Sequence, residues 1–249
     1  MTLEDAGPGT QANRAAPRIV ILTGAGISAE SGLGTFRDAG GLWSSYDLAE
    51  VATPEGYSAN PSLVLDFYNA RRANCRGAEP NAAHHALAKL MAQHSGHVTL
   101  ITQNIDDLHE RSGSAPVHHM HGEVMRAQCA ACGARWPVDT DLTTADSCAA
   151  CGVTGRVRPD VVWFGEVPYG LDMIGDALAA ADLFVAVGTS GAVYPAAGLV
   201  SEATRHGADT LELNLERSEI SGLFGQRRLG PASKTVPAWV NEVLGVTSG

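Results

Sequence analysis

The chain has 249 residues, of which 45% are hydrophobic, and its formal net charge is −10. This length is sufficient for one large domain with a full hydrophobic core, or for a large domain that carries a small insertion. The negative charge argues against direct binding to nucleic acids or anionic membranes, because both require clustered lysine and arginine. The longest apolar runs, such as residues 183–187, are too short to span a bilayer.

Residues 1–16 lack a basic start followed by an apolar core, so they do not have the pattern of a signal peptide. We expect them to form a disordered tail. We also expect the protein to be cytoplasmic, to have no membrane partner, and to be a monomer or a weak oligomer.

The first predicted element is a buried parallel strand at residues 18–23, which is followed by a glycine-rich turn. Gly24, Gly26 and Ala29 fit the G-x-G-x-x-G/A form that opens a helix in dinucleotide-binding proteins. In that form the glycines let the backbone approach a pyrophosphate, and the helix N-terminus supplies free N–H groups. These three positions alone are also compatible with a purely geometric role for glycine in the turn.

The whole string from residue 24 to residue 43 resembles the cofactor loop of sirtuins, the NAD-dependent protein lysine deacylases. Gly34 stands where the family usually has proline, which predicts a more flexible loop in the absence of a ligand. The resemblance implies that NAD is bound by Gly24, Ala25, Gly26, Ser28, Ala29, Phe36, Arg37 and Trp43.

A helical insertion is predicted over about residues 42–81, and in it Tyr68 and Arg71 lie on the same side of a helix. This Tyr-x-x-Arg pair resembles the signature of class III sirtuins, which prefer succinyl-lysine and malonyl-lysine. A guanidinium can bind a terminal carboxylate with two hydrogen bonds, and a phenol adds a third. The small Ala52 upstream leaves room for the acyl group. The alternative is that Arg71 and Arg72 are solvated and that Tyr68 belongs to the core.

A helix is expected at residues 82–93, and the next strand, at residues 97–102, ends in a polar run. This run again resembles the sirtuin pattern. The resemblance implies that Asn104 and Asp106 are catalytic residues that hold the nicotinamide and its ribose, and that Gln103 bonds to the ribose. Ile105 lies between them as a further cofactor contact. The alternative is a polar helix start that Asn104 or Asp106 caps.

Three histidines follow in a short strand-like run, at His118, His119 and His121. Strand alternation places His119 and His121 on one face and His118 on the other. The step from His121 to glycine is where the sirtuin family has its catalytic base, so the resemblance assigns that role to His121. An imidazole titrates near neutral pH and suits the removal of a proton from a ribose hydroxyl. The other two histidines are expected to be structural.

Two CxxC pairs lie in a segment that has few large apolar residues, over residues 126–157. In a cytosolic chain this spacing predicts a closed structural zinc site, because four thiolates leave no position for water. The alternative is a pair of redox-active or incidental CxxC units. Cys75 is left over and is expected to be an inert helix residue. The predicted zinc ligands are Cys129, Cys132, Cys148 and Cys151.

The segment at residues 158–166 resembles the part of sirtuins that binds the acylated peptide. Its predicted substrate contacts are Val162, Phe164, Gly165 and Glu166. The resemblance implies that they line the tunnel for the acyl-lysine and pair with the substrate backbone as an added strand. The implied partners are therefore acylated-lysine proteins or peptides. Without the resemblance, such an apolar run would ordinarily be core.

A helix at residues 171–181 precedes two further strands, at residues 183–187 and 210–214. Strands that alternate with helices predict a doubly wound parallel sheet, in which ligands bind at the carboxyl ends of the strands. Polar or glycine-rich motifs follow these strands at Gly188, Thr189 and Ser190 and at Asn214, Leu215 and Glu216. The resemblance places them on the adenosine-ribose side of NAD, and Ala232 near adenine.

We therefore predict an α/β fold, with a Rossmann-like doubly wound parallel sheet, a small inserted zinc-binding lobe and a helical insertion. The Rossmann-like domain is expected to comprise residues 17–125 and 158–249. The implied reaction displaces nicotinamide by the acyl oxygen, and His121 then activates the ribose. Its products are free lysine, nicotinamide and O-acyl-ADP-ribose. A plain lysine deacetylase and a protein ADP-ribosyltransferase with the same NAD site are the alternatives.

A zinc-ribbon nucleic-acid binder is the non-enzymatic alternative. It is disfavoured because residues 126–158 contain neither a basic stripe nor a platform of aromatic side chains.

Overall fold

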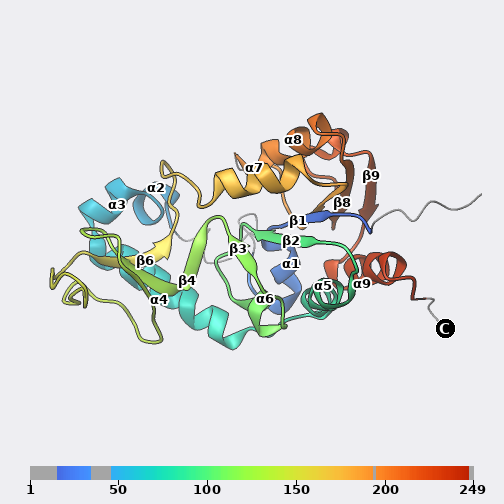
Figure 1. The fold of residues 1–249 in the computed structure, drawn as a ribbon. Helices are drawn as coiled ribbons and strands as arrows, with labels where there is room; N and C mark the ends of the chain where they lie inside the picture. Colours follow the sequence, from blue (N-terminus) through green and yellow to red (C-terminus); the bar gives the residue numbers. More distant parts are fainter. Residues whose placement is uncertain (1–15, 35–45, 193–194, 247–249) are drawn as a thin grey trace, which may run out of the picture.

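The computed structural model describes residues 16–34, 46–192 and 195–246 of the chain. These residues form one large sheet and one small sheet (Figure 1). The large sheet has the strand order β3 (Val117–His119), β2 (Val98–Thr102), β1 (Ile19–Thr23), β7 (Leu183–Val187), β8 (Asp209–Asn214) and β9 (Gln226–Leu229). Its neighbouring strands all pair in parallel. The parallel sheet confirms the predicted fold class.

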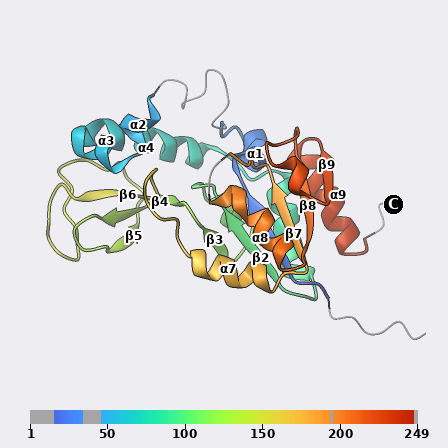
Figure 2. The same ribbon diagram turned by 90° about the horizontal axis from the view of Figure 1, so that it is seen from above.

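Helices cover both faces of the large sheet (Figures 1 and 2). On one face lie α5 (Ala82–Gln93) and α9 (Ala232–Val243), and on the other lie α7 (Leu171–Ala179) and α8 (Leu199–Arg205). The side chains of β1 alternate between the two cores: Ile19 and Ile21 join the α5–α9 side, whereas Val20 and Leu22 join the α7–α8 side. The strand needs an unbroken apolar run because both of its faces are covered.

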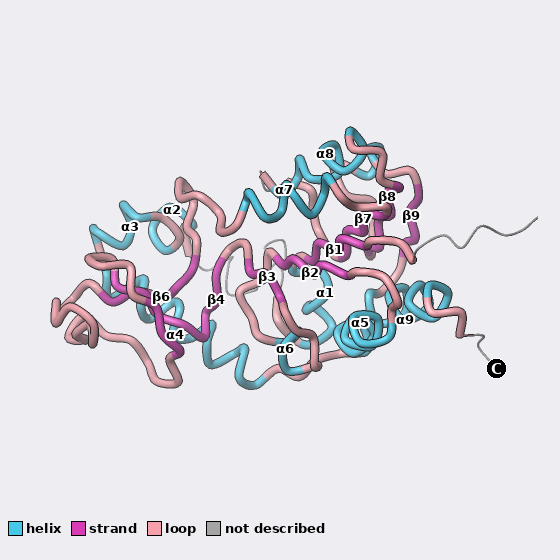
Figure 3. Tube along the Cα trace, viewed as in Figure 1, coloured by secondary structure: helices cyan, strands magenta, loops and turns pink. Residues whose placement is uncertain are grey.

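The small sheet lies at one end of the molecule, beside a group of helices (Figure 3). Its order is β5 (Arg135–Pro137), β4 (Gly122–Cys129) and β6 (Val157–Val161), and its strands are antiparallel. The helices are α2 (Leu48–Val51), α3 (Pro54–Ala59) and α4 (Pro61–Gly77). They form the predicted helical insertion. Strands β4 and β6 run through residues 126 and 157, so the exact domain boundaries stay predictions.

Helix α4 begins with a side-chain cap and a proline. The Asn60 side chain accepts a hydrogen bond of 3.2 Å from the N–H of Leu63, and Pro61 occupies the first turn. Its buried side includes Phe67, Tyr68, Arg72 and Cys75. The helix therefore presents a mixed polar and apolar side to the small sheet.

The remaining helical segments are short turns that join these elements. They are α1 (Ala25–Ser28), η1 (Ala29–Ser31), α6 (Leu108–Arg111), η3 (Ala196–Gly198) and η4 (Ser221–Leu223). No helix in the described part of the chain is long and apolar enough to cross a membrane.

Candidate active site

A cavity of about 1030 Å³ lies where the carboxyl ends of β1, β2, β7 and β8 approach the small sheet. Every described residue that was predicted to contact a ligand lines it. These residues are Gly24, Ala25, Gly26, Ser28, Ala29, Tyr68, Arg71, Gln103, Asn104, Ile105, Asp106, His121, Val162, Phe164, Gly165, Glu166, Gly188, Thr189, Ser190, Asn214, Leu215, Glu216 and Ala232. Phe36, Arg37 and Trp43 lie outside the described residues. The contacts of all these residues with ligands stay predictions.

The glycine turn after β1 packs directly against the turn after β7. A side-chain carbon on Gly24 would lie 2.8 Å from the carbonyl oxygen of Gly188, and one on Gly26 would lie 2.7 Å from its Cα. The N–H of Gly24 bonds to the carbonyl of Val187 at 2.9 Å, and that of Gly26 to the carbonyl of Gly188 at 2.8 Å. These two N–H groups are thus already used. The two glycines are needed because any side chain there would collide with the backbone at Gly188, so they let the two turns pack closely.

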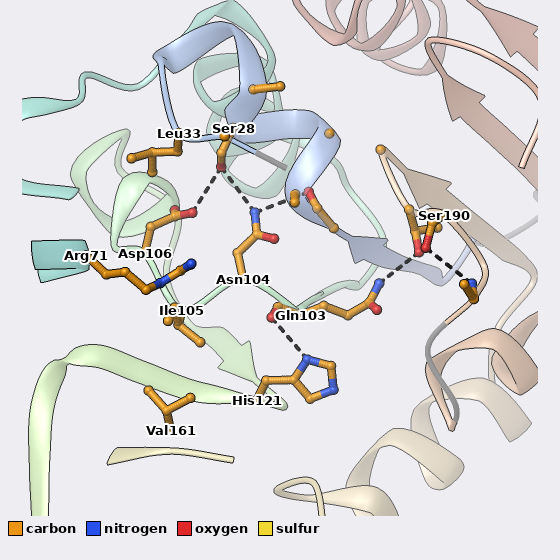
Figure 4. Close-up of a pocket in the computed structure, with 18 of the residues that line it drawn as sticks. Ser28, Leu33, Arg71, Gln103, Asn104, Ile105, Asp106, His121, Val161 and Ser190 are labelled. Carbon is orange, nitrogen blue, oxygen red and sulfur yellow. Dashed lines mark hydrogen bonds between the residues drawn. The ribbon is translucent and has the colours of Figure 1, made fainter. Parts of the chain in front are cut away.

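A buried hydrogen-bond network joins α1 to the polar run after β2 (Figure 4). The Asn104 side-chain amide donates to the Gly24 carbonyl at 3.2 Å and to the Ser28 hydroxyl at 3.1 Å. That hydroxyl donates in turn to a carboxylate oxygen of Asp106 at 3.1 Å. Because both N–H groups of the Asn104 amide are used, its carbonyl oxygen is the part left for a ligand.

Asp106 is almost completely enclosed. Burial raises the pKa of its carboxyl, while hydrogen bonds from the Leu108 backbone and from Ser28 oppose that rise. His84 approaches the Ser28 hydroxyl from the other side, at 3.4 Å. Since the Asn81 backbone N–H donates to Nδ1 of His84, its Nε2 carries the proton and donates to Ser28. Ser28 therefore accepts twice and donates once, to Asp106.

Thr189 accepts hydrogen bonds that link the ends of three strands of the large sheet. The side chain of Gln103 supplies the first of them. Its side-chain amide donates to the Thr189 hydroxyl at 3.0 Å. The Asn214 side-chain amide donates to the Thr189 backbone carbonyl at 2.8 Å. These bonds hold the ends of β2, β7 and β8 together along one wall of the cavity (Figure 4).

His121 presents one ring nitrogen to the cavity. Its Nδ1 lies 3.1 Å from the backbone carbonyl oxygen of Gln103 (Figure 4). A carbonyl can only accept, so Nδ1 carries the proton, and Nε2 of the neutral ring has a free lone pair. Burial lowers the pKa of His121, although the Gln103 bond opposes this. The ring is therefore held neutral, in the tautomer that a base requires.

His119 has a different environment from His121. Its Nδ1 lies 3.0 Å from the Asn104 backbone carbonyl, and its Nε2 lies 2.8 Å from the Glu110 carboxylate. Both partners are acceptors, so the ring satisfies them only as a doubly protonated imidazolium. Burial lowers the pKa of His119, but the hydrogen bond and charge of Glu110 outweigh it and raise the pKa overall. His118 bonds instead to the Tyr169 carbonyl, at 2.8 Å.

The opposite end of the cavity is formed by α4 and the segment after β6. Tyr68 is 2% exposed, and its hydroxyl oxygen accepts a 3.0 Å hydrogen bond from the indole N–H of Trp163. Burial raises the pKa of Tyr68 to about 12, so the hydroxyl keeps its proton. Arg71 also lines this end, and burial lowers its pKa without removing the charge. The alternative of a solvated Arg71–Arg72 pair does not fit, because Arg71 lines the cavity and Arg72 is buried. Tyr68 does belong to a core cluster, as that alternative supposed.

Glu166 lines the cavity, but its carboxylate is already bound. It forms two hydrogen bonds with the Arg158 guanidinium, of 2.6 and 2.9 Å, and accepts a third from the Trp163 backbone at 2.8 Å. The backbone N–H groups of Val162 and Phe164 bond to the carbonyls of His121 and Ala52, each at 2.9 Å. A substrate strand would therefore pair with other backbone groups of this segment rather than with these two N–H groups.

Trp163 has a role in the cavity that sequence reasoning missed. The apolar run around it indicates core, and nothing in that run predicts its hydrogen bond to Tyr68. The signal for it was chemical: a buried indole N–H needs an acceptor. Cys75 lines the cavity one turn after Arg71, and burial raises the pKa of its thiol to about 12. That protonated thiol is consistent with the inert role predicted for it.

The four cysteines of the two CxxC pairs converge beside the small sheet. Their sulfur atoms all lie within 4.8 Å of one another, and two of the Sγ–Sγ distances are 3.7 Å. These distances are too long for disulfide bonds. Zinc–sulfur bonds of about 2.3 Å at tetrahedral angles would place the sulfurs about 3.8 Å apart. The cluster formed by Cys129, Cys132, Cys148 and Cys151 could therefore hold a structural zinc ion.

The sequence of the chain is similar to those of known proteins. A model of the Sir2 family matches residues 24–195. A protein of Caulobacter vibrioides called NAD-dependent protein deacylase is 56% identical over 230 residues, which cover 91% of this chain and 97% of the relative. The protein of the same name from Escherichia coli K12 is 52% identical over 230 residues, which cover 92% of this chain and 82% of the relative.

The fold of the chain is also similar to solved structures of Sir2 proteins. The structure of a Sir2 homologue in complex with NAD is similar to this chain, with a TM-score of 0.84 and 36% identity over 92% of this chain and 90% of that one. A Sir2 complex with the inhibitor EX-527, 2′-O-acetyl-ADP-ribose and a deacetylated p53 peptide has a TM-score of 0.76 and 29% identity, over 92% of this chain and 94% of that one.

Proposed function

The chain belongs to the Sir2 family, and we propose that it is an NAD-dependent protein lysine deacylase that prefers succinyl and malonyl groups and also removes acetyl groups. One observation carries the proposal: Arg71 and Tyr68 line the same cavity as His121 and Asp106. A cation and a phenol thus share one enclosed space with a neutral imidazole. This arrangement suits an acyl chain that ends in a carboxylate.

The residues that line the cavity fit NAD. The carbonyl oxygen of the Asn104 amide and the Asp106 carboxylate would orient the nicotinamide and its ribose, and the turn after β7 would meet the adenosine ribose. Gly24 and Gly26, whose turn packs closely on the turn after β7, would lie beside the pyrophosphate. NAD supplies the ribose carbon that takes up the acyl oxygen when nicotinamide leaves.

His121 is the proposed base. Its Nδ1–H is held by the Gln103 carbonyl, so Nε2 can accept a proton from a ribose hydroxyl. With that proton removed, the ribose hydroxyl of bound NAD would be a nucleophile for the acyl carbon. The protonated His121 would return the proton to the departing lysine amine, and one water would complete O-acyl-ADP-ribose. General base catalysis of this kind contributes about two to four powers of ten in rate. The walls of the cavity would hold the reacting groups in position.

The acyl preference follows from the end of the cavity near α4. Arg71 can donate two hydrogen bonds to a terminal carboxylate, and the Tyr68 hydroxyl can donate one, because its oxygen already accepts from Trp163. Hydrogen bonds to charged groups are worth about 1.5–3 kcal/mol each. An acetyl group offers no carboxylate, so it gains none of this binding energy.

The proposed partners are proteins or peptides that carry acylated lysines. The segment after β6 would bind them through its backbone, beside Phe164, which lines the cavity and is 48% exposed. Direct binding to nucleic acids is not expected at a net charge of −10. A cytoplasmic location and a monomeric or weakly oligomeric state stay predictions.

The test is side-by-side kinetics on acetyl, malonyl and succinyl versions of one peptide, for the wild type and for Arg71→Met. We expect the wild type to prefer the succinyl and malonyl peptides. The variant should lose about 10²- to 10⁴-fold in kcat/KM on the succinyl peptide and keep some activity on the acetyl peptide. Arg76→Met, which removes the same charge from an exposed position on the same helix, is the control. Equal loss on all three peptides would make Arg71 a structural residue.

Mass spectrometry of the products tests the reaction itself. A deacylase converts the acyl peptide to free lysine together with O-acyl-ADP-ribose and nicotinamide. An ADP-ribosyltransferase would instead add mass to a protein that carries no acylated lysine. That second result would overturn the proposal.

A further inference from the structure

Trp163 and Tyr68 form a buried pair at the acyl end of the cavity. The indole is 3% exposed and the phenol 2% exposed, and the indole N–H donates to the phenol oxygen at 3.0 Å. An indole N–H can only donate, so the Tyr68 oxygen must act as the acceptor. The hydroxyl proton of Tyr68 therefore points away from Trp163. Both side chains line the cavity, so the bond between them sets the direction in which the Tyr68 hydroxyl proton points.

The indole of Trp163 is itself held in place by charged groups. The Arg158 guanidinium carbon lies 3.3 Å from the centre of the Trp163 rings, which is a close cation–π contact. Arg158 cannot turn away, because it is 6% exposed and donates to the Val161 carbonyl at 2.7 Å and to both oxygens of Glu166.

Glu166 holds the main chain of the same segment as well. Its carboxylate accepts from the Trp163 backbone N–H at 2.8 Å, so one group anchors both the backbone of Trp163 and the cation that covers its ring. The orientation of the indole is thus set before any ligand enters the cavity. A side chain that is already ordered loses little entropy when the ligand binds.

We propose that Trp163 is a positioning residue that determines acyl specificity: its indole N–H occupies the Tyr68 oxygen and so aims the Tyr68 hydroxyl proton at the carboxylate that Arg71 binds. This inference rests on the proposed function. Phenylalanine at position 163 would keep an aromatic ring over Arg158 but would leave the Tyr68 hydroxyl free to turn. An acetyl group has no carboxylate to accept the Tyr68 hydrogen bond. Turnover of the acetyl peptide therefore depends less on the bond between Trp163 and Tyr68.

The kinetic test is a double-mutant cycle with Trp163→Phe, Tyr68→Phe and the double variant. Each is assayed on acetyl and succinyl forms of one peptide at saturating NAD. We expect Trp163→Phe to lower the succinyl-to-acetyl ratio of kcat/KM by roughly three- to tenfold, mainly through a higher KM for the succinyl peptide. The double variant should have nearly the ratio of Tyr68→Phe alone, because Trp163 acts through Tyr68. Equal losses on both peptides, or additive losses in the ratio, would overturn the inference.

Stability gives a second readout of the same bond, without turnover. Tyr68→Phe leaves the buried indole N–H without its acceptor and should lower Tm by about 2–10 °C. The double variant removes the N–H as well, so its Tm should fall by less than the sum of the two single variants. Additive changes in Tm would show that the bond does not form. Trp239→Phe is the matched control for the loss of a buried indole away from Tyr68. Trp239 is also 3% exposed, but it lies in α9, among the core residues of the large sheet.

The outcomes separate this inference from the proposed function. A wild-type enzyme with no preference for the succinyl peptide would overturn both. A clear preference that Arg71→Met abolishes and Trp163→Phe leaves unchanged would overturn only the role of Trp163.

Discussion

Acid should destabilise this protein through the buried histidine His109. Its ring is fully enclosed, and Nε2 lies 2.9 Å from the Thr23 hydroxyl. Burial, with smaller contributions from His84 and His119, lowers the pKa of His109 from its ordinary 6.5 to about 3. As the pH falls through about 6.5, His109 of the unfolded chain becomes protonated, whereas His109 of the folded chain stays neutral. The stability from the neutral ring is fully present above that pH and is lost as the pH falls toward the folded value.

The size of the effect follows from the difference between the two pKa values. At pH 5 the unfolded chain is protonated at this site and the folded chain is not, which corresponds to about 1.5 pKa units, or about 2 kcal/mol. The variant His109→Gln cannot take up this proton. The difference in the free energy of unfolding between wild type and variant should therefore be about 2 kcal/mol smaller at pH 5 than at pH 7.

Urea unfolding at the two pH values, with zinc present throughout, measures this difference. Comparison at two pH values cancels the packing cost of the substitution, because that cost does not depend on pH. His85→Gln, at an exposed position on the same helix as His84, controls for the loss of a histidine ring. If the wild type and His109→Gln differed by the same free energy at pH 5 and pH 7, the reasoning about His109 would be refuted.

Two further predictions concern the base and the metal. His121→Tyr should fold and bind NAD, as measured by calorimetry, but turn over almost nothing because it lacks the Nε2 lone pair; near-normal turnover would remove His121 from the reaction. Removal of zinc with a chelator should lower Tm by about 5 °C or more and make four thiols reactive toward a thiol reagent while Cys75 stays protected. An unchanged Tm after loss of the metal would show that zinc does not stabilise the small lobe.

Local patterns in the sequence predicted most of the architecture. Strand β1 was evident because its residues are apolar at every position and a glycine turn follows, which is typical of a strand covered on both faces. The cysteines were paired by spacing alone, and their sulfurs do converge. The polar motifs that follow separate strands line a single cavity, because the carboxyl ends of parallel strands lie along the same edge of a sheet.

Sequence patterns could not predict how side chains from different elements pair. Glu166 is predicted to contact the substrate, a prediction that stays untested, but no spacing reveals that its carboxylate binds Arg158. Nor does the glycine pattern reveal that the N–H groups of Gly24 and Gly26 bond to the main chain at the end of β7. Both sets of bonds depend on neighbours that are distant in sequence or on a turn whose shape no spacing encodes.

The sequence by itself predicted the family, the parallel sheet, the cysteine cluster and a candidate base, because each depends on residue types at short and regular spacings. Only the tertiary structure decided the protonation of the two neighbouring histidines. His119 lies between two acceptors, whereas His121 has one acceptor and a cavity. It also decided the direction of the Tyr68 proton, because Trp163 reaches that hydroxyl from a segment 95 residues further along the chain. Charge and hydrogen-bond direction are properties of the folded environment, and in this protein they distinguish side chains of the same chemical type.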